Sequence, residues 1–481
     1  MSDNLKEKMI GALTWSSIDR IGQQGVQFII GIVLARLLCP ADYGLIGMVM
    51  IFAQFAYAMV ESGLGAALVR TKNLTETHCN TVFYTNLSIS IILYTILFFC
   101  APMIADFFNQ PILTIISRVT FAAILFNSMY LVPFNIAGRE LDYKTITKVN
   151  ITSTIISGTA GITMAYYNMG VWALVVQQTG YHFVRMICFH AFSKWKPKLL
   201  FSFNILRGYF QFSAHMLGTS LLTVIFNNIY TFLIGKFYSI NQVGYYTQGY
   251  KFSDSVNFTF LAILGTSYNL FAKIQHQQER IKRILGELVK NTSIVTIPIT
   301  MFLIASAKPL FFVLFGTKWL DSVPFFQLIC AANLFAPIYQ INIHSLNSMG
   351  KSHITFRMEL FKRVLILTSI LTCFTYGINT MLYGYILSCW IAFICSVLCV
   401  YKFVGNNGKQ QFTQVLPGII IGLAVALLVI GTSFISNNLY LTLTLQVLFT
   451  FALYIIIVRV FFKDLFLRLI AYIKTKKLNF K

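Results

Sequence analysis

Charged residues are scarce in this chain of 481 residues, since Asp, Glu, Lys and Arg together make up only 11% of it, against about 25% in soluble domains. Acids are the rarer kind, with 15 Asp and Glu against 37 Lys and Arg. So little charge cannot cover the surface of a water-soluble fold of this size, and 57% of the residues are hydrophobic. The composition excludes a soluble enzyme and indicates an integral membrane protein.

The chain also lacks the short motifs of nucleotide and metal chemistry. It contains no P-loop, HExxH or GxSxG sequence, its histidines have no metal-ligand spacing, and its nine cysteines include no CxxC pair. The net charge of +22 would favour nucleic acid in a soluble protein, but a membrane protein keeps Lys and Arg in its cytoplasmic loops. We therefore expect no metal, no cofactor, no nucleic-acid partner and no direct use of ATP.

Long apolar runs are what the sequence does contain. A helix needs about 20 mostly apolar residues to cross a bilayer, and these runs are continuous, without the alternation of barrel strands. We therefore predict an all-α integral membrane protein with about fourteen transmembrane helices. The expected spans are residues 10–38, 43–66, 80–101, 112–137, 145–167, 171–190, 205–235, 243–271, 292–307, 323–349, 360–379, 381–400, 415–435 and 439–458.

The distribution of Lys and Arg predicts the orientation of these spans. With the N-terminus in the cytoplasm, the inner segments hold 29 of the 37 basic residues and the outer loops hold 4. A single missed span would invert every later loop and destroy this ratio, so both termini are expected to be cytoplasmic. Two basic amphipathic segments, residues 273–290 and the tail 459–481, are expected to lie on the inner leaflet.

A thin internal repeat predicts two lobes. Residues 35–48 match residues 235–248 at an offset of 200, and each segment is the outer turn between the first two spans of a set of six. Pro133 and Pro337 recur in the fourth span of each set. Two pseudo-symmetric six-helix lobes of the same orientation, followed by two further helices, would enclose a cavity between them. The predicted boundaries are 1–198 and 199–402 for the lobes and 403–481 for the last two helices and a basic amphipathic cytoplasmic tail.

Seven charged side chains fall inside the predicted spans, where hydrocarbon makes a charge costly unless it pairs or meets an aqueous cavity. They are Asp19, Arg20, Glu61, Arg118, Arg185, Lys251 and Asp254. Arg20 and Glu61 are expected at one depth in adjacent spans, where they can form an ion pair. Arg185 lies five residues from the inner end of its span, so we expect its side chain to reach the interface.

Lys251 and Asp254 are expected near the middle of the bilayer, where a charge is costliest. They lie three residues apart in a stretch, YYTQGYKFSDSVNF, that is too polar to face lipid and is therefore expected to line the cavity. Amide side chains on neighbouring spans suit sugar hydroxyls and are expected to line the same cavity. These are Gln24, Gln27, Gln54, Asn227, Asn228 and Gln248.

Three segments carry a family resemblance: WSS at 15–17 with Gly22, ARLLCPADYGLIGM at 35–48, and VESGLGAALVR at 60–70. Together with the span count and topology they resemble the Wzx-type polysaccharide and O-antigen flippases. These belong to the multidrug/oligosaccharidyl-lipid/polysaccharide exporter superfamily, and the resemblance is to its colanic-acid and teichuronic-acid exporter branch. The motif at 35–48 is the most specific part of this resemblance.

The resemblance implies export of an undecaprenyl-diphosphate-linked oligosaccharide across the bacterial inner membrane, by ion-driven alternating access of two lobes, for surface polysaccharide biosynthesis. It implies membrane lipids, a polysaccharide polymerase and export machinery as partners. Cavity cations would bind the diphosphate and sugar acids, a role that falls here on Arg20 and Lys251, and next on Arg118 and Arg185. The acids could instead bind the coupling H⁺ or Na⁺, and these are Asp19, Glu61 and Asp254.

Two other functions compete with the flippase. A multidrug or cation antiporter of the same superfamily would use the three acids as its substrate site, but four intramembrane cations disfavour a cationic drug. A membrane-embedded O-antigen polymerase or ligase would need a catalytic loop on the outer face, and no outer connection is long enough for one. The expected function is therefore that of a secondary transporter with no enzymatic activity.

Overall fold

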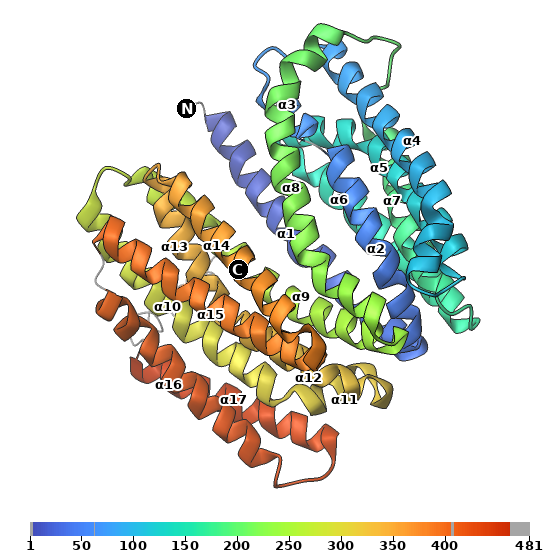
Figure 1. Cartoon of the computed structure of the whole chain (residues 1–481). Coiled ribbons are helices and arrows are strands. Elements are labelled where there is room, and N and C mark those ends of the chain that lie inside the picture. Colours follow the sequence, from blue (N-terminus) through green and yellow to red (C-terminus); the bar gives the residue numbers. More distant parts are fainter. Residues whose placement is uncertain (1–2, 62, 406–407, 462–481) are drawn as a thin grey trace, which may run out of the picture. The chain divides into compact units, whose positions relative to one another are not determined.

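Helices account for every regular element in the part of the chain that the computed structural model describes, residues 3–61, 63–405 and 408–461. These residues form seventeen α-helices and two short 3₁₀ helices (Figure 1). Each of the fourteen predicted spans overlaps at least one helix. Most of the tail predicted on the inner leaflet, residues 462–481, lies outside the described residues.

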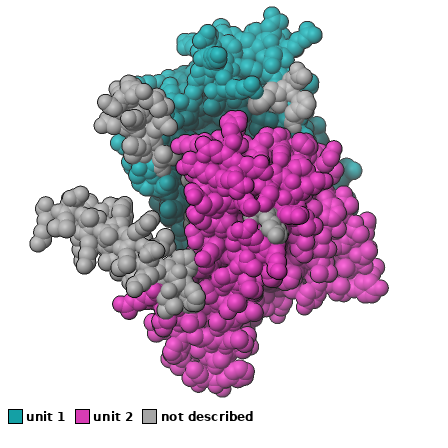
Figure 2. All heavy atoms as spheres, turned by 90° about the vertical axis from the view of Figure 1, so that its left-hand side faces the viewer, with its two compact units in different colours: residues 1–248 teal, residues 249–481 magenta. Residues whose placement is uncertain are grey.

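The helices group into two compact units, Met1–Gln248 and Gly249–Lys481, which Figure 2 distinguishes by colour. The first unit contains eight helices and the beginning of α9. Their bounds are α1 Asp3–Leu37, α2 Pro40–Glu61, α3 Leu64–Arg70, α4 Glu76–Phe107, α5 Leu113–Arg139, α6 Tyr143–Tyr166, α7 Trp172–Phe192, α8 Phe203–Phe237 and α9 Ile240–Lys273.

The second unit contains the rest of α9 and all later elements. Their bounds are α10 Gln278–Ala305, α11 Ala307–Phe315, η1 Thr317–Ser322, α12 Val323–Ala332, α13 Ala336–Ser348, α14 Ser352–Cys373, η2 Phe374–Tyr376, α15 Ile378–Val404, α16 Gly408–Thr432 and α17 Leu439–Phe461. The unit boundary lies within α9, whereas the repeat placed a lobe boundary at residue 198. Because α8 packs against α2, α3 and α4, it belongs to the first unit by contact. The symmetric lobes stay a prediction.

Two predicted spans are broken. The span 43–66 contains α2 and α3, and the span 323–349 contains α12 and α13, separated by a turn at residues 333–335. Pro337 is the second residue of α13, where its missing N–H needs no partner, whereas Pro133 lies inside the continuous helix α5. The two prolines that the repeat matched therefore have different structural effects, and one starts a helix while the other is accommodated within one.

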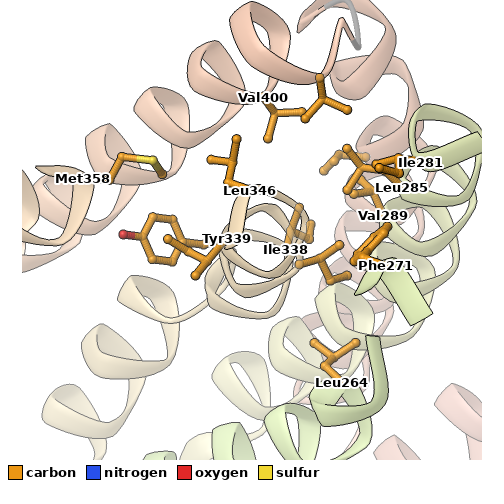
Figure 3. Close-up of a cluster of buried hydrophobic side chains, with 14 of the residues drawn as sticks. Leu264, Phe271, Ile281, Leu285, Val289, Ile338, Tyr339, Leu346, Met358 and Val400 are labelled. Carbon is orange, nitrogen blue, oxygen red and sulfur yellow. The ribbon is translucent and has the colours of Figure 1, made fainter. Parts of the chain in front are cut away.

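The basic segment predicted on the inner leaflet is also corrected by the structure. α10 begins at Gln278 and continues without interruption to Ala305, so most of residues 273–290 forms the first turns of a long helix. The apolar face of these turns is buried within the second unit, because Ile281, Leu285 and Val289 belong to a cluster of buried hydrophobic side chains there (Figure 3). This face packs on protein, and only the basic face remains for solvent or lipid headgroups.

Nine segments among the described residues are long and apolar enough to cross a membrane. Five other helices of at least 21 residues are more polar and do not meet that criterion, namely α1, α6, α7, α9 and α14. Four of the seven predicted intramembrane charges, Asp19, Arg20, Lys251 and Asp254, lie on α1 and α9, and Arg185 lies on α7. Polarity is thus concentrated on a subset of helices, as expected for helices that face protein or water instead of lipid.

Small residues allow the closest helix contacts in the second unit, where α10 and α16 pack along their length. Gly418 and Gly422 lie one turn apart on α16 and face Ser293 and Ile297 of α10. A Cβ atom at Gly418 would collide with the backbone carbonyl of Ser293. This is the small-xxx-small arrangement that lets two membrane helices approach closely without a hydrophobic driving force.

We expect Gly418→Ala to destabilise the protein by about 1–3 kcal/mol, because overpacking must push α16 away from α10. The matched control is Gly431→Ala on the same helix, since nothing lies within 4 Å of the added Cβ there. The measurement is the midpoint of thermal unfolding in detergent micelles. Equal midpoints for the two variants would show that this contact does not depend on the missing side chain.

Candidate functional site

The first unit contains a cavity of about 590 Å³ between α2, α3, α5 and α8. It lies where the second predicted span is broken. Gly63 at this break has a φ of +78°, a conformation that residues with a side chain rarely adopt, and an added Cβ would press on Met216 of α8. Residues on both sides of the break line the cavity.

Polar side chains from all but one of these helices face the cavity. They are Gln54 and Glu61 of α2, Asn135 of α5, and Thr219, Ser220 and Thr223 of α8. Tyr57 and Phe134 add two aromatic rings, and Leu131, Met216 and Val224 add apolar surface. Glu61 is exposed and is the one charged side chain among the residues that line the cavity. The wall therefore combines hydroxyl and amide groups with aromatic faces and a single carboxylate.

Gln54 and Asn228 form the contact that joins α2 to α8 beside this cavity. The side-chain nitrogen of Asn228 donates a hydrogen bond to Oε1 of Gln54 at 2.8 Å and also bonds the Val224 carbonyl at 2.9 Å. Both residues were predicted to line a cavity, and the structure brings them together. Such amide pairs between membrane helices are worth about 0.6–2 kcal/mol.

Arg185 of α7 lies next to the cavity inside a group of aromatic rings. Its guanidinium carbon is 4.4 Å from the ring centre of Tyr130, 5.0 Å from that of Phe134, and 5.7 Å from those of Tyr181 and Phe189. The faces of aromatic rings attract a cation electrostatically. The expectation that this side chain reaches the membrane interface is therefore wrong, because these rings hold it within the unit.

Tyr130 is the hydrogen-bond centre of this group. Its hydroxyl donates to Oδ1 of Asn127 at 2.5 Å, accepts from Nη1 of Arg185 at 3.0 Å, and lies 3.0 Å from Nδ1 of His182. A hydroxyl has one proton, so the contact with His182 requires that Nδ1 of the imidazole be the donor. The His182 ring also stacks on Tyr57 at 5.0 Å, which links the Arg185 group to the cavity wall.

Arg185 is the cation whose charge acts on Glu61. The predicted Arg20–Glu61 ion pair does not form, and Arg20 is an exposed side chain on α1. An estimate of depth along two helices cannot tell on which side of α1 a residue points. The charge next to Glu61 comes instead from α7, a helix that is adjacent to α5 but distant from α2 in the sequence.

Two other predicted intramembrane charges of the first unit, Asp19 and Arg118, contact neighbouring helices. The side-chain nitrogen of Asn150 on α6 donates to both carboxylate oxygens of Asp19, at 3.1 and 3.2 Å. Arg118 donates from Nε to the Phe98 carbonyl at 3.3 Å, and its guanidinium lies 4.3 Å from the Phe98 ring centre. These contacts attach α1 to α6 and α5 to α4. Neither Asp19 nor Arg118 lines the cavity.

The other predicted cavity residues are not among those that line this cavity. Gln24 is half-buried and Gln27 exposed on α1, Asn227 is exposed on α8, and Gln248 is buried on α9. Lys251 and Asp254 are exposed on the part of α9 that belongs to the second unit. Their assignments as substrate and ion ligands stay predictions. No group of three or more His, Cys, Asp or Glu side chains among the described residues could hold a metal ion.

Sequence reasoning missed the aromatic and amide residues that organise the site, namely Tyr57, Asn127, Tyr130, Phe134, Tyr181 and His182. A helical spacing signal was nevertheless present. Tyr181 precedes Arg185 by four residues, and Tyr57 precedes Glu61 by four, which puts each pair on one helix face. A rule that looks for Tyr one turn before an intramembrane charge would have found both.

We expect Tyr130→Phe to lower the free energy of unfolding by about 1–3 kcal/mol, because Arg185, Asn127 and His182 would each lose a buried partner. Tyr166→Phe is the matched control, since Tyr166 is 72% exposed. The measurement is thermal unfolding of both variants in the same detergent. A Tyr130→Phe protein as stable as the control would show that the ring alone holds Arg185.

Known proteins share both the sequence pattern and the fold. The chain is 23% identical over 351 residues to the succinoglycan biosynthesis transport protein ExoT of Rhizobium meliloti, covering 73% of this chain and 71% of that one. It is 22% identical to the teichuronic acid biosynthesis protein TuaB of Bacillus subtilis, over 90% of both chains. The solved structure of the lipid II flippase MurJ covers 95% of this chain and 100% of its own, at 16% identity and a TM-score of 0.72.

The chain thus shares the fold of MurJ, and nine segments among its described residues are suited to cross a membrane. The model of the family described as polysaccharide biosynthesis protein matches residues 33–324, which contain α2 to α11, the cavity and the Arg185 group. The match extends over more than half of the chain. This chain belongs to the polysaccharide biosynthesis protein family.

Proposed function

We propose that this protein is a flippase that exports a lipid-linked oligosaccharide across the bacterial inner membrane for surface polysaccharide biosynthesis. The proposal depends on one combined observation. The chain belongs to the polysaccharide biosynthesis protein family, and its described part contains helices that are long and apolar enough to cross a membrane. A polysaccharide pathway that assembles its units on a lipid carrier inside the cell must move them outward, and a body of apolar helices is suited to that step. ExoT, which is named as a transport protein, supports the same conclusion.

The proposed topology has fourteen crossings with both termini in the cytoplasm. It is supported by the charge asymmetry, with 29 basic residues in inner segments against 4 in outer loops. Two six-helix lobes and two further helices would alternate access by rocking, and the two broken spans are places where such a movement can bend the chain. The longest connection between helices among the described residues, residues 193–202, is assigned to the inner side.

Ion coupling is part of the proposal, with H⁺ or Na⁺ as the driving ion and the acids as candidate ligands. Asp19 is engaged by Asn150, and Glu61 lies in the field of Arg185. Asp254 is exposed on α9. We therefore assign the coupling role first to Asp254. A polysaccharide polymerase and export machinery are the proposed protein partners.

A membrane polymerase or ligase is disfavoured by the short connections on the predicted outer side. Residues 108–112, 167–171, 238–239 and 433–438 leave no room for a catalytic loop between the helices they join. An enzyme of that kind needs several polar groups that converge on the outer face. The site that the structure does form lies instead among helices of the first unit, near the break in the second span.

Export can be tested with the purified protein in liposomes that contain an undecaprenyl-diphosphate oligosaccharide. We expect protein-dependent loss of accessibility of the glycan to an external sugar-modifying enzyme, faster when an ion gradient is imposed. Protein-free liposomes give the background rate. An unchanged accessibility in the presence of folded protein, with several glycans tried, would contradict the proposal.

We expect Lys251→Ala to reduce this export at least tenfold, because a cation near the middle of the membrane would bind the substrate diphosphate. Lys290→Ala is the matched control, since Lys290 is an exposed lysine of α10 in a predicted inner segment. Unchanged export by Lys251→Ala would remove Lys251 from the site.

Asp254→Asn tests the coupling role separately. We expect export by this variant to lose its dependence on the H⁺ or Na⁺ gradient while some gradient-independent export remains, because an amide can neither bind a proton nor supply a charged ligand. Export rates of the wild type and the variant are compared across pH and Na⁺ concentration. The same ion dependence in both would assign coupling to another acid.

A further inference from the structure

The cavity of the first unit offers a specific mixture of hydrogen-bonding groups. Gln54 uses its carbonyl oxygen to accept from Asn228, which directs its amide nitrogen to act as a donor. Asn135 uses its amide nitrogen on the Leu131 carbonyl at 2.7 Å, so its side-chain oxygen serves as an acceptor. Ser220 adds a hydroxyl that can do both. The wall thus offers both donors and acceptors.

The aromatic rings at the cavity add a second feature. Tyr57 comes from α2 and Phe134 from α5, and both line the space that Glu61 borders. A ligand with a saturated ring, an apolar face and hydroxyls around its rim suits such a wall. The C–H groups of the ligand can pack on an aromatic side chain, while its hydroxyls bond to the amides and the carboxylate of the wall. The volume of about 590 Å³ lies within the range of about 300–1,000 Å³ typical of sites for small ligands.

Electrostatics distinguish among three classes of ligand. An organic cation would favour a wall with several carboxylates, but Glu61 is the one charged side chain among the residues that line this cavity, and the positive charge of Arg185 acts on it. A diphosphate would need a cation in the wall, and Arg185 is already held among four aromatic rings and bonded to Tyr130. Apart from Glu61, the wall offers hydroxyls, amides and aromatic rings. A neutral, hydroxyl-rich ligand satisfies this site, and the other two classes do not.

The carboxylate of Glu61 still contributes strongly to such a site. It accepts hydrogen bonds from neutral donors, and bonds to a charged acceptor are stronger than those between neutral groups. Vicinal hydroxyls present two donors at a spacing that a carboxylate can bridge. The positive charge of Arg185 reduces the free-energy cost of placing this carboxylate next to apolar helices. Tyr130 and His182 together keep Arg185 in position.

We propose that the cavity between α2, α3, α5 and α8 binds a sugar ring of the transported glycan, with Glu61 and the Tyr57 ring as its main contacts. Arg185 is a positioning residue that compensates Glu61 and is not a ligand for the substrate phosphates. This assignment rests on the proposed function, and it specifies which part of the substrate the first unit recognises.

The test is saturation-transfer difference NMR on the full chain in lipid nanodiscs. The probes are the methyl glycosides of glucose, galactose and N-acetylglucosamine, together with inorganic pyrophosphate and tetraphenylphosphonium. We expect signal transfer to at least one glycoside, with about tenfold weaker binding in Glu61→Gln and in Tyr57→Leu, the loss expected for one hydrogen bond to a charged group. Glu287→Gln is the matched control, because Glu287 is an exposed carboxylate on α10.

No transfer to any glycoside in the wild type would overturn the proposal, as would glycoside binding that Glu61→Gln and Tyr57→Leu leave unchanged. Binding of tetraphenylphosphonium that depends on Glu61 would assign the cavity to organic cations, and pyrophosphate binding that depends on Arg185 would assign it to phosphates.

Thermal unfolding shows that each variant is folded. The liposome assay separates the two proposals, since export without glycoside binding refutes only the sugar site, and glycoside binding without export refutes only the flippase.

Discussion

A hydrocarbon environment cannot solvate polar groups, and this constraint decides how every part of the molecule is arranged. The backbone satisfies it by forming helices throughout the described residues. Polar side chains satisfy it by bonding within the protein, as Asp19 does with Asn150 and Gln54 with Asn228. Arg185 shows the constraint at its strongest, because a guanidinium among helices needs aromatic faces, a hydroxyl and a nearby acid together.

The same constraint explains how much of the fold the sequence reveals. Each of the fourteen predicted spans overlaps a helix, and nine segments among the described residues are apolar enough to cross a membrane, because a lipid-facing helix must be apolar over a fixed distance. The interruptions at Gly63 and at residues 333–335 were missed, because a chain that leaves helical geometry inside protein keeps an apolar composition. Gly63 could have indicated the first break, but glycine is common in membrane helices and many positions of this chain carry one without bending.

The candidate site was predictable in composition but not in pairing. Glu61, Gln54 and Asn228 were identified because polar residues are expensive in an apolar run. Their partners depend on which helices are neighbours, and that is a property of the tertiary packing. α2 contacts α5, α7 and α8, so Glu61 meets a cation from α7. A depth argument along two consecutive helices could only suggest Arg20, whose side chain points elsewhere and is exposed.

A transporter also has to release what it binds, and this requirement bears on why a site for a neutral ligand would suit the first unit. A substrate held by several salt bridges in a low-dielectric interior would leave slowly, since each charged contact there is strong and geometrically demanding. Hydrogen bonds to hydroxyls and amides are individually modest, because water offers the sugar equivalent bonds on either side of the membrane, and Glu61 adds a single stronger contact. A site of that kind distinguishes a glycan by its shape and hydroxyl pattern while its occupant remains exchangeable. The carboxylate of Glu61 then serves recognition of the substrate. Arg185, held by its aromatic group, limits how tightly that carboxylate binds, so that the substrate can still be released.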